Sequence, residues 1–164
     1  ILLEAIKSLD SCTLRIVGAA EDPAYREQVQ SLVAGCDPDR VQAKIGFVTD
    51  AEADEELSAA DLVVLPYREF GAQSGVFWLA VAHGKPVVVT DVGALAESVR
   101  RLGNGMIAKA GDVEALAGAL KLAIEPSALA RMTRTAELAE SGAGWQDAAL
   151  DTLKVYERVD DGIA

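Results

Sequence analysis

The residues best suited to bind a ligand lie in the loop "YREFGAQSGV", residues 67–76. Gly71 and Gly75 would let the backbone approach a ligand closely, because neither carries a Cβ atom. Ser74 is a favourable residue to begin the helix that follows, and its hydroxyl can also donate a hydrogen bond. The N–H groups of a first helical turn have no partner within the helix and lie at its positive end. The loop therefore predicts a site for a diphosphate or a similar anion.

The residues assigned to this anion site lie at or near the junction between loop and helix. They are Arg68, Gly71, Gln73, Ser74, Gly75 and Val76. The net charge of −11 does not oppose the assignment, because exposed charges farther away than a Debye length, about 8 Å at physiological salt, are largely screened. A second interpretation is equally open, since many helices begin with Ser and Gly only because these residues cap them.

The other reactive side chains favour structural roles. Cys12 and Cys36 lie in no CxxC or His-rich pattern, so we expect two unpaired thiols in a reducing cytoplasm. His83, the single histidine, is expected in the last turn of a helix, where partial positive charge is favourable. Asp91 is expected to stabilise a turn. No metal site, nucleophile or general base is predicted.

Strands and helices alternate along the chain when apolar periodicity is followed. Short apolar runs predict strands at residues 14–18, 41–48, 61–66, 86–90 and 105–109, and helical spacing predicts helices at 24–35, 49–60, 74–83, 112–124, 126–140 and 144–158. This order predicts a doubly wound, Rossmann-like α/β domain with a parallel sheet. Ligands of such sheets bind outside the carboxyl ends of the strands. The loops after Gly18, Val48, Pro66 and Thr90 are therefore expected at one edge.

The composition limits the partners. Apolar residues make up 51% of the chain and aromatic residues only 5%, so the core must consist mainly of Ala, Val, Leu and Ile. With 26 acidic and 15 basic side chains, the chain is not expected to bind nucleic acid or an anionic membrane. No apolar run approaches the roughly 20 residues that span a bilayer. We expect a single domain, residues 1–164, that is part of a longer protein because it opens inside a helix without Met.

Several segments resemble the C-terminal, donor-binding half of retaining glycosyltransferases of the GT-B type, the group 1 family. They are "LRIVGAAED", "DLVVLPYR", "LAVAHGKPVVVTDVGAL", "GNGMIAKAGDVEALAGAL" and "GWQDAALDTLKVYERV". The resemblance covers nearly the whole chain. It implies that the full-length protein transfers a hexosyl group from a nucleoside-diphosphate sugar to an acceptor. In this family helix amides and cationic side chains replace a metal ion, so the donor sugar is the only small molecule implied.

The resemblance also implies roles for individual residues. Gly18 matches a Gly-rich turn near the donor, and the backbone around Val48 matches the segment that meets the nucleobase, whereas the side chains of Phe47 and Val48 are expected in the core. Gln73 and Ser74 resemble a variant of some bacterial members in which they replace an acidic loop.

The chain departs from the family at two glutamates. Counting back from Lys85 and Pro86, the first glutamate of the family's loop falls at Gly71, and the second, which binds the ribose, falls at Leu79. Glu69 stands too early to replace the first, so no catalytic residue is assigned within this chain. A ribose-binding carboxylate contributes about 1.5–3 kcal/mol per hydrogen bond, which Leu79 cannot supply.

The resemblance places the family's phosphate-binding Arg and Lys, and its catalytic His, before the region matched. We therefore expect the isolated fragment to be inactive and to require the N-terminal domain of the same chain. The helix at 144–158, with Trp145 and Tyr156 on its apolar stripe, is expected to pack on that domain. The same stripe offers a surface for a homodimer of the fragment.

Two alternatives stay open. The loss of both glutamates is also expected of a catalytically degenerate domain kept for interaction or assembly. A receiver-type signalling domain is less favoured, because Pro66 and Tyr67 stand where a phosphorylated Asp would follow the strand.

Overall fold

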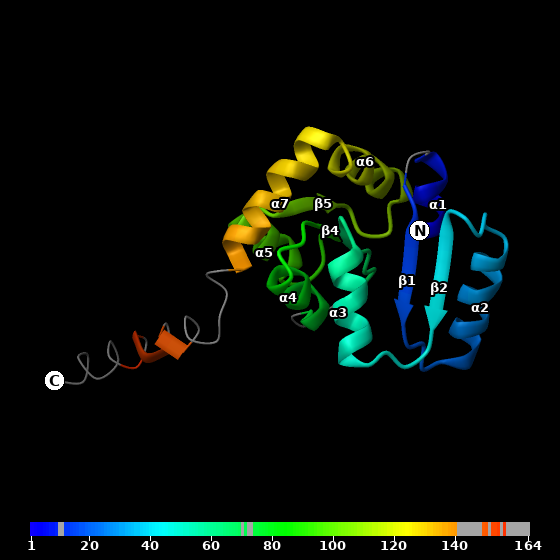
Figure 1. The fold of residues 1–164 in the computed structure, drawn as a ribbon, viewed down its shortest axis with the longest axis horizontal. Coiled ribbons are helices and arrows are strands. Elements are labelled where there is room, and N and C mark those ends of the chain that lie inside the picture. The colour runs from blue at the N-terminus through cyan, green and yellow to red at the C-terminus, as the bar shows by residue number, and fades with distance from the viewer. Residues whose placement is uncertain are drawn as a thin grey trace.

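The computed structural model describes residues 1–9, 12–69, 71, 74–140, 149–150, 152–154 and 156. In chain order the elements are α1 (Leu2–Ala5), η1 (Ile6–Ser8), β1 (Leu14–Gly18), α2 (Pro23–Ala34), β2 (Val41–Ile45), α3 (Asp50–Ala59), β3 (Val63–Leu65), α4 (Gly75–Ala82), β4 (Val87–Thr90), α5 (Leu95–Leu102), β5 (Gly105–Ala108), α6 (Val113–Ala123) and α7 (Pro126–Glu140) (Figure 1). The predicted alternation of strands and helices is confirmed. The strands predicted at 41–48 and 61–66 are shorter than expected.

The strands form two parallel sheets, one of order β1–β2 and one of order β3–β4–β5. In the first sheet Leu14 is opposite Val41, and in the second Val87 is opposite both Val63 and Gly105. The pairing of β4 with β5 depends on this glycine, because a Cβ atom at residue 105 would lie 2.2 Å from the carbonyl oxygen of Val87. The parallel, doubly wound architecture is confirmed, but in the part of the chain that is described no ladder joins β1 to β3.

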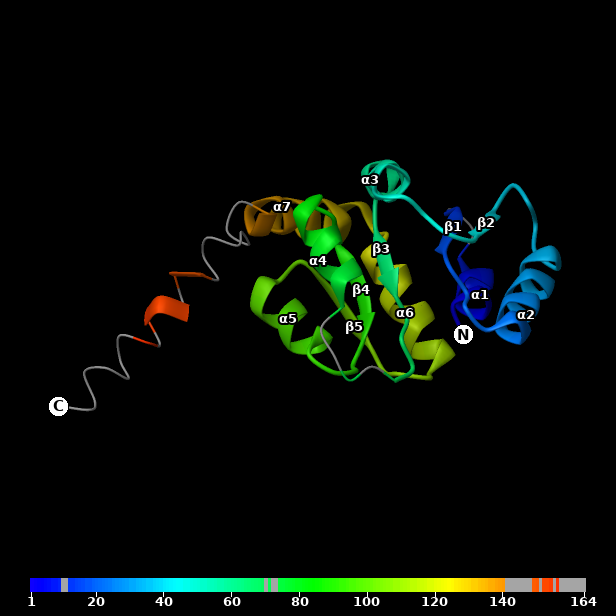
Figure 2. The same cartoon turned by 90° about the horizontal axis from the view of Figure 1, so that it is seen from below.

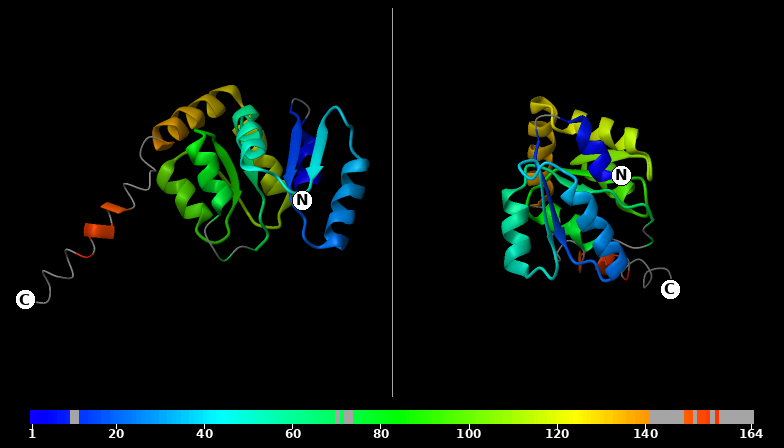
Figure 3. Two further views of the ribbon diagram at one scale, coloured as in Figure 1. Left: turned by 60° about the horizontal axis from the view of Figure 1, so that its bottom comes forward. Right: turned by 90° about the vertical axis from the view of Figure 1, so that its right-hand side faces the viewer.

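Helices cover both faces of the strands (Figures 2 and 3). On one face α1 and α6 pack on the strands through a core that includes Ala5, Leu14, Val88, Ala108 and Leu116. Helix α7 adds Met132 to this core and contacts α4, α5 and α6. On the other face α3, α4 and α5 pack through a core that includes Leu57, Leu65, Phe77, Val81, Val89 and Val99. All four side chains of β4 are fully buried between these layers. β4 is therefore the central strand of the three-stranded sheet, as its run of valines predicts.

Helix α3 connects the two sheets and is held to the first by ion pairs. Thr49 caps α3 together with Glu52 in a reciprocal capping box. Glu52 also pairs with Lys44 of β2, and Glu56 accepts two hydrogen bonds of 2.5 and 2.6 Å from the guanidinium of Arg15 in β1. One face of α3 thus binds β1 and β2, while Leu57 packs beside β3.

The helix predicted at 144–158 lies largely outside the described residues, Trp145 included. The described positions 149–150, 152–154 and 156 are helical. Leu150, Leu153 and Tyr156 are each more than half exposed. Packing of this segment on another domain, or in a homodimer, stays a prediction. No helix within the described ranges is long and apolar enough to cross a membrane.

Candidate functional site

The junction between loop and helix at Ser74 is built as the sequence predicts. Ser74 is the N-cap of α4, and its Oγ accepts a hydrogen bond of 3.2 Å from the N–H of Phe77. The residue is only 2% exposed. Its hydroxyl therefore faces the protein and fixes the start of the helix, which leaves ligand contact to the backbone around it.

Two further polar residues hold this junction in place. The Tyr67 hydroxyl lies 3.1 Å from Ser74 Oγ. The carbonyl oxygen of Tyr67 accepts a 2.6 Å hydrogen bond from the hydroxyl of Thr90, which is fully buried at the end of β4. The loop after β3 is thus tied both to the neighbouring strand and to the helix that it enters. Sequence reasoning missed both roles, although each residue is the first polar group after a buried apolar run.

The outer side of the first turn of α4 is open. A Cβ atom built on Gly75 meets nothing within 4 Å, and Val76 and Leu79 are each 45% exposed. No described residue accepts a hydrogen bond from the N–H of Gly75 or Val76. Because Phe77, Ala80 and Val81 are buried on the opposite side, the free N–H groups lie at an accessible helix N-terminus, as an anion site requires.

The other residues assigned to the donor lie at the ends of β1, β2 and β3. Gly18 ends β1 with a φ of +148°, a conformation that favours glycine, and its carbonyl accepts a 2.9 Å hydrogen bond from Gly46. Val48 follows β2 and is half-buried. Phe47, expected in the core, is 83% exposed, so that prediction is wrong. Strand β2 ends at Ile45, so Phe47 lies beyond the strand.

The loop after β3 is exposed where it is described. Arg68, Glu69 and Gly71 are all accessible to solvent, and a Cβ atom at Gly71 meets nothing within 4 Å. Gln73 lies outside the described residues. In a parallel sheet the carboxyl ends of all the strands lie at one edge. Each of the two sheets therefore brings its predicted donor residues to its own carboxyl edge.

The predicted structural side chains have protein partners. His83 Nε2 lies 3.1 Å from Asp54 Oδ1 of α3 and joins α4 to that helix. Asp91 Oδ1 accepts a 2.6 Å hydrogen bond from the N–H of Ala110 beyond β5. Cys12 and Cys36 are free thiols, as expected. Within the described residues, no group of three His, Cys, Asp or Glu side chains is arranged to hold a metal ion.

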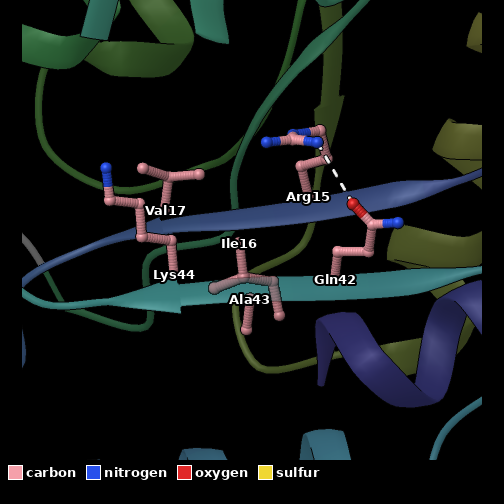
Figure 4. Close-up of a pocket in the computed structure, with 6 residues that line it drawn as sticks. All are labelled: Arg15, Ile16, Val17, Gln42, Ala43 and Lys44. Carbon is pink, nitrogen blue, oxygen red and sulfur yellow. Dashed lines mark hydrogen bonds between the residues drawn. The ribbon is translucent and has the colours of Figure 1, made fainter. Parts of the chain in front are cut away.

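A small hollow of about 120 Å³ lies on β1 and β2 (Figure 4). Its lining residues are Arg15, Ile16, Val17, Gln42, Ala43 and Lys44. Arg15 donates a 3.1 Å hydrogen bond to Gln42 across it. The hollow includes none of the predicted donor residues, and small-molecule sites are usually about 300–1,000 Å³. We therefore do not assign the ligand site to it.

Comparison with known proteins decides the family. Residues 1–125 match the description "Glycosyl transferases group 1". The chain belongs to the glycosyl transferases group 1 family. The chain is 31% identical over 135 residues to D-inositol 3-phosphate glycosyltransferase from Pseudarthrobacter chlorophenolicus, and the match covers 81% of the chain and 32% of the relative. It is also 30% identical to phosphatidyl-myo-inositol mannosyltransferase from Mycobacterium leprae across 97% of the chain and 42% of the relative.

Solved structures agree on the fold. Sucrose-phosphate synthase from Thermosynechococcus elongatus superposes on 98% of this chain with a TM-score of 0.76 and 26% identity, and the match covers 42% of that structure. The structure of Anabaena Alr3699/HepE in complex with UDP has the same TM-score at 23% identity and is covered to 44%. The predicted GT-B resemblance is thus confirmed for family and fold. The chain spans less than half the length of each of these proteins.

Proposed function

We propose that this chain is the donor-binding domain of a retaining glycosyltransferase that transfers a hexosyl group from a nucleoside-diphosphate sugar to an acceptor. The observation that carries the proposal is the open N-terminus of α4, where the N–H groups of Gly75 and Val76 have no described acceptor. A diphosphate at this position would accept hydrogen bonds from these groups and gain from the helix dipole. Curated relatives of the chain are named as glycosyltransferases.

The diphosphate would lie beside Arg68, Gly71 and Gly75. Arg68 is exposed after β3 and supplies a cation that can reach a phosphate oxygen. Gly71 and Gly75 offer approach without a Cβ atom in the way. Helix N–H groups and cationic side chains, some of these side chains on the N-terminal domain, would then stabilise the negative charge of the leaving diphosphate.

The nucleoside would extend towards β1 and β2. Gly18 leaves open space at the end of β1. The exposed ring of Phe47 offers an apolar surface next to Val48. Leu79 lies on the accessible side of α4, and the resemblance expects the family's ribose-binding glutamate at this position. Donor affinity therefore depends mainly on the phosphate contacts.

Gly75→Val tests the phosphate assignment with little risk to the fold. The glycine has no positive φ and no neighbour within 4 Å of a built Cβ atom, so the added side chain fills only the space in front of the N–H groups. A hydrogen bond to a charged group is worth about 1.5–3 kcal/mol, so the loss of one weakens binding about tenfold or more. The measurement is calorimetric titration with UDP, GDP and ADP.

Gly118→Val is the matched control, because Gly118 lies in α6 and its built Cβ atom also meets nothing within 4 Å. Nucleotide affinity should fall in Gly75→Val alone. Equal affinities in both variants would remove the phosphate assignment. If the parent protein bound none of the three nucleotides, a degenerate domain kept for assembly would be the better conclusion.

A further inference from the structure

The loop that leads from β1 to α2, residues 19–21, is held by one side chain. The ladder between β1 and β2 ends where the N–H of Gly46 donates to the carbonyl oxygen of Gly18, 2.9 Å away. Two hydrogen bonds, of 2.7 and 3.2 Å, then run from the guanidinium of Arg26 in α2 to the carbonyl oxygen of Ala20. In the part of the chain that the structure describes, no other hydrogen bond holds the backbone of this loop.

The burial of Ala20 makes the contact with Arg26 important. Ala20 is 7% exposed, although its neighbours Ala19 and Glu21 are both exposed. Water therefore has little room to replace the guanidinium, and a buried carbonyl group without a partner is unfavourable. Two N–H groups of one planar guanidinium also fix the direction of the carbonyl, which a single flexible donor does not. Removal of Arg26 should therefore release the loop.

Both ends of the loop are fixed independently of Arg26. Gly18 belongs to β1 and pairs with Ile45 of β2. Asp22 is the N-cap of α2, and its carboxylate accepts a 2.9 Å hydrogen bond from the N–H of Ala24. Without Arg26 the three residues in between can move while the strand and the helix stay in place. Arg26 thus controls the conformation of the loop and not the presence of the elements beside it.

The loop borders the surface to which the proposed nucleoside extends. The carboxyl ends of β1 and β2 lie at one edge, and Figure 1 shows both arrowheads at the end where α2 starts. Phe47 and Val48 follow directly after Gly46, whose N–H is bonded to Gly18. A Cβ atom built on Gly18 meets nothing within 4 Å, and the ring of Phe47 is exposed. A nucleoside at this edge would therefore contact the backbone that leads into the loop.

The start of α2 is unsuited to a phosphate group, unlike the start of α4. Pro23 is the first residue of α2 and has no N–H. The carboxylate of Asp22 takes the N–H of Ala24 and adds negative charge at the same place. At α4, by contrast, the N–H groups of Gly75 and Val76 have no described acceptor. The loop before α2 is therefore suited to the uncharged end of a nucleotide.

We propose, on the premise of the proposed function, that Arg26 is a positioning residue for the nucleoside of the donor. By holding the carbonyl group of Ala20, it keeps the loop after β1 in the conformation that the nucleoside contacts. Arg26 itself does not need to touch the donor. A loop that is ordered before binding increases affinity, because its ordering no longer opposes association.

Calorimetric titration of Arg26→Ala tests this role with UDP, GDP and ADP and with inorganic pyrophosphate. Arg26 is an exposed residue, so its truncation carries little risk to the fold. A nucleotide that the parent protein binds should bind about fivefold or more weakly, since ordering even one backbone residue on binding has an effect of this size. Pyrophosphate should bind as in the parent protein, because it would contact only the start of α4.

Arg40→Ala is the matched control. The guanidinium of Arg40 also donates to backbone carbonyl groups, those of Ile6 and Leu9, but it directly precedes β2 and so lies at the opposite end of the same sheet. This variant should lower the Tm and leave the affinities for nucleotide and pyrophosphate unchanged. Arg26→Lys keeps the charge but not the planar pair of donors, so its nucleotide affinity should lie between those of Arg26→Ala and the parent protein.

Backbone order parameters from NMR relaxation test the loop without any nucleotide. Residues 19–21 should have values near those of a rigid backbone, about 0.85, in the parent protein and in Arg40→Ala, and below about 0.6 in Arg26→Ala. Unchanged order parameters in Arg26→Ala would overturn the positioning role. So would full nucleotide affinity in Arg26→Lys, which would show that the charge alone is required, or an equal loss of affinity for nucleotide and pyrophosphate in Arg26→Ala.

The titrations also separate this role from the proposed function. Unchanged nucleotide affinity in Arg26→Ala would remove the role of Arg26 and leave the phosphate site in place. Nucleotides that bind the parent protein no more tightly than pyrophosphate would show that no nucleoside contact exists, with the same consequence for Arg26. A parent protein that binds neither pyrophosphate nor nucleotide would contradict the proposed function itself, and the order parameters would still decide whether Arg26 fixes the loop.

Discussion

Substitution of Ser74 by alanine should show how much the N-cap of α4 contributes to the free energy of unfolding. The Ser74 hydroxyl is the N-cap of the helix and also contacts Tyr67. Loss of a serine N-cap costs about 1 kcal/mol. Because Ser74 is 2% and Phe77 1% exposed, water cannot easily replace the lost partner, and an unsatisfied buried group adds about 1–3 kcal/mol. We expect Ser74→Ala to lower the free energy of unfolding by about 2–4 kcal/mol.

Urea unfolding followed by circular dichroism measures this loss, which corresponds to a decrease in Tm of about 4–16 °C for a chain of this size. Asp112→Ala is the matched control. Asp112 caps α6 through a 2.9 Å hydrogen bond from the N–H of Ala115, but it is only half-buried and lies outside the proposed site. It should cost about 1 kcal/mol and leave nucleotide affinity unchanged, whereas Ser74→Ala should lower both stability and affinity.

A loss for Ser74→Ala no larger than that for Asp112→Ala would refute the argument from burial. It would mean that water or a rearranged loop satisfies the N–H of Phe77. A double-mutant cycle with Tyr67→Phe separates the two contacts of the hydroxyl, because only the Tyr67 contact gives a coupling between the two substitutions.

Two further predictions concern α3 and the outer side of α4. The ammonium of Lys44, with the N–H and hydroxyl of Thr49, holds the pKa of Glu52 at about 2, below its usual 4.5. This carboxylate therefore contributes stability that is complete above pH 4.5 and is lost as the pH falls towards 2, so Glu52→Gln should flatten the decrease in Tm over that range. Leu79→Glu should raise nucleotide affinity about tenfold, because a carboxylate at this exposed position can accept from ribose hydroxyls. Leu122→Glu, the same change at another exposed leucine, on α6, should leave the affinity unaltered, and equal effects of the two would refute the ribose assignment.

The sequence predicted best those features that depend on neighbouring residues. Ser74, Thr49 and Asp112 all cap the helices expected to follow them. A cap requires only a side-chain oxygen and an N–H group two or three residues later, so short stretches of sequence contain the necessary information. β1 was predicted with the bounds that the structure gives it, because Gly18 breaks the apolar run where the strand ends.

Features that depend on distant residues could not be predicted in the same way. β2 ends at Ile45 because its partner β1 ends at Gly18, and this pairing places Phe47 outside the core. Apolar character alone predicted burial for that ring. Likewise, Tyr25 and Leu32 follow a helical stripe in α2, yet both are more than half exposed. Such a stripe is buried only where another element packs against it. The periodicity of the sequence does not show whether such an element is present.

The division into two sheets bears directly on the proposed donor site. The proposed phosphate contacts, around Ser74 and Gly75, are attached to β3 and β4, whereas Gly18 and Val48 are attached to β1 and β2. Between the two sheets the described contacts are side-chain packing and the ion pairs of α3, which involve exposed groups and are weak individually. The separation between the proposed phosphate and nucleoside contacts therefore depends on this packing and these ion pairs.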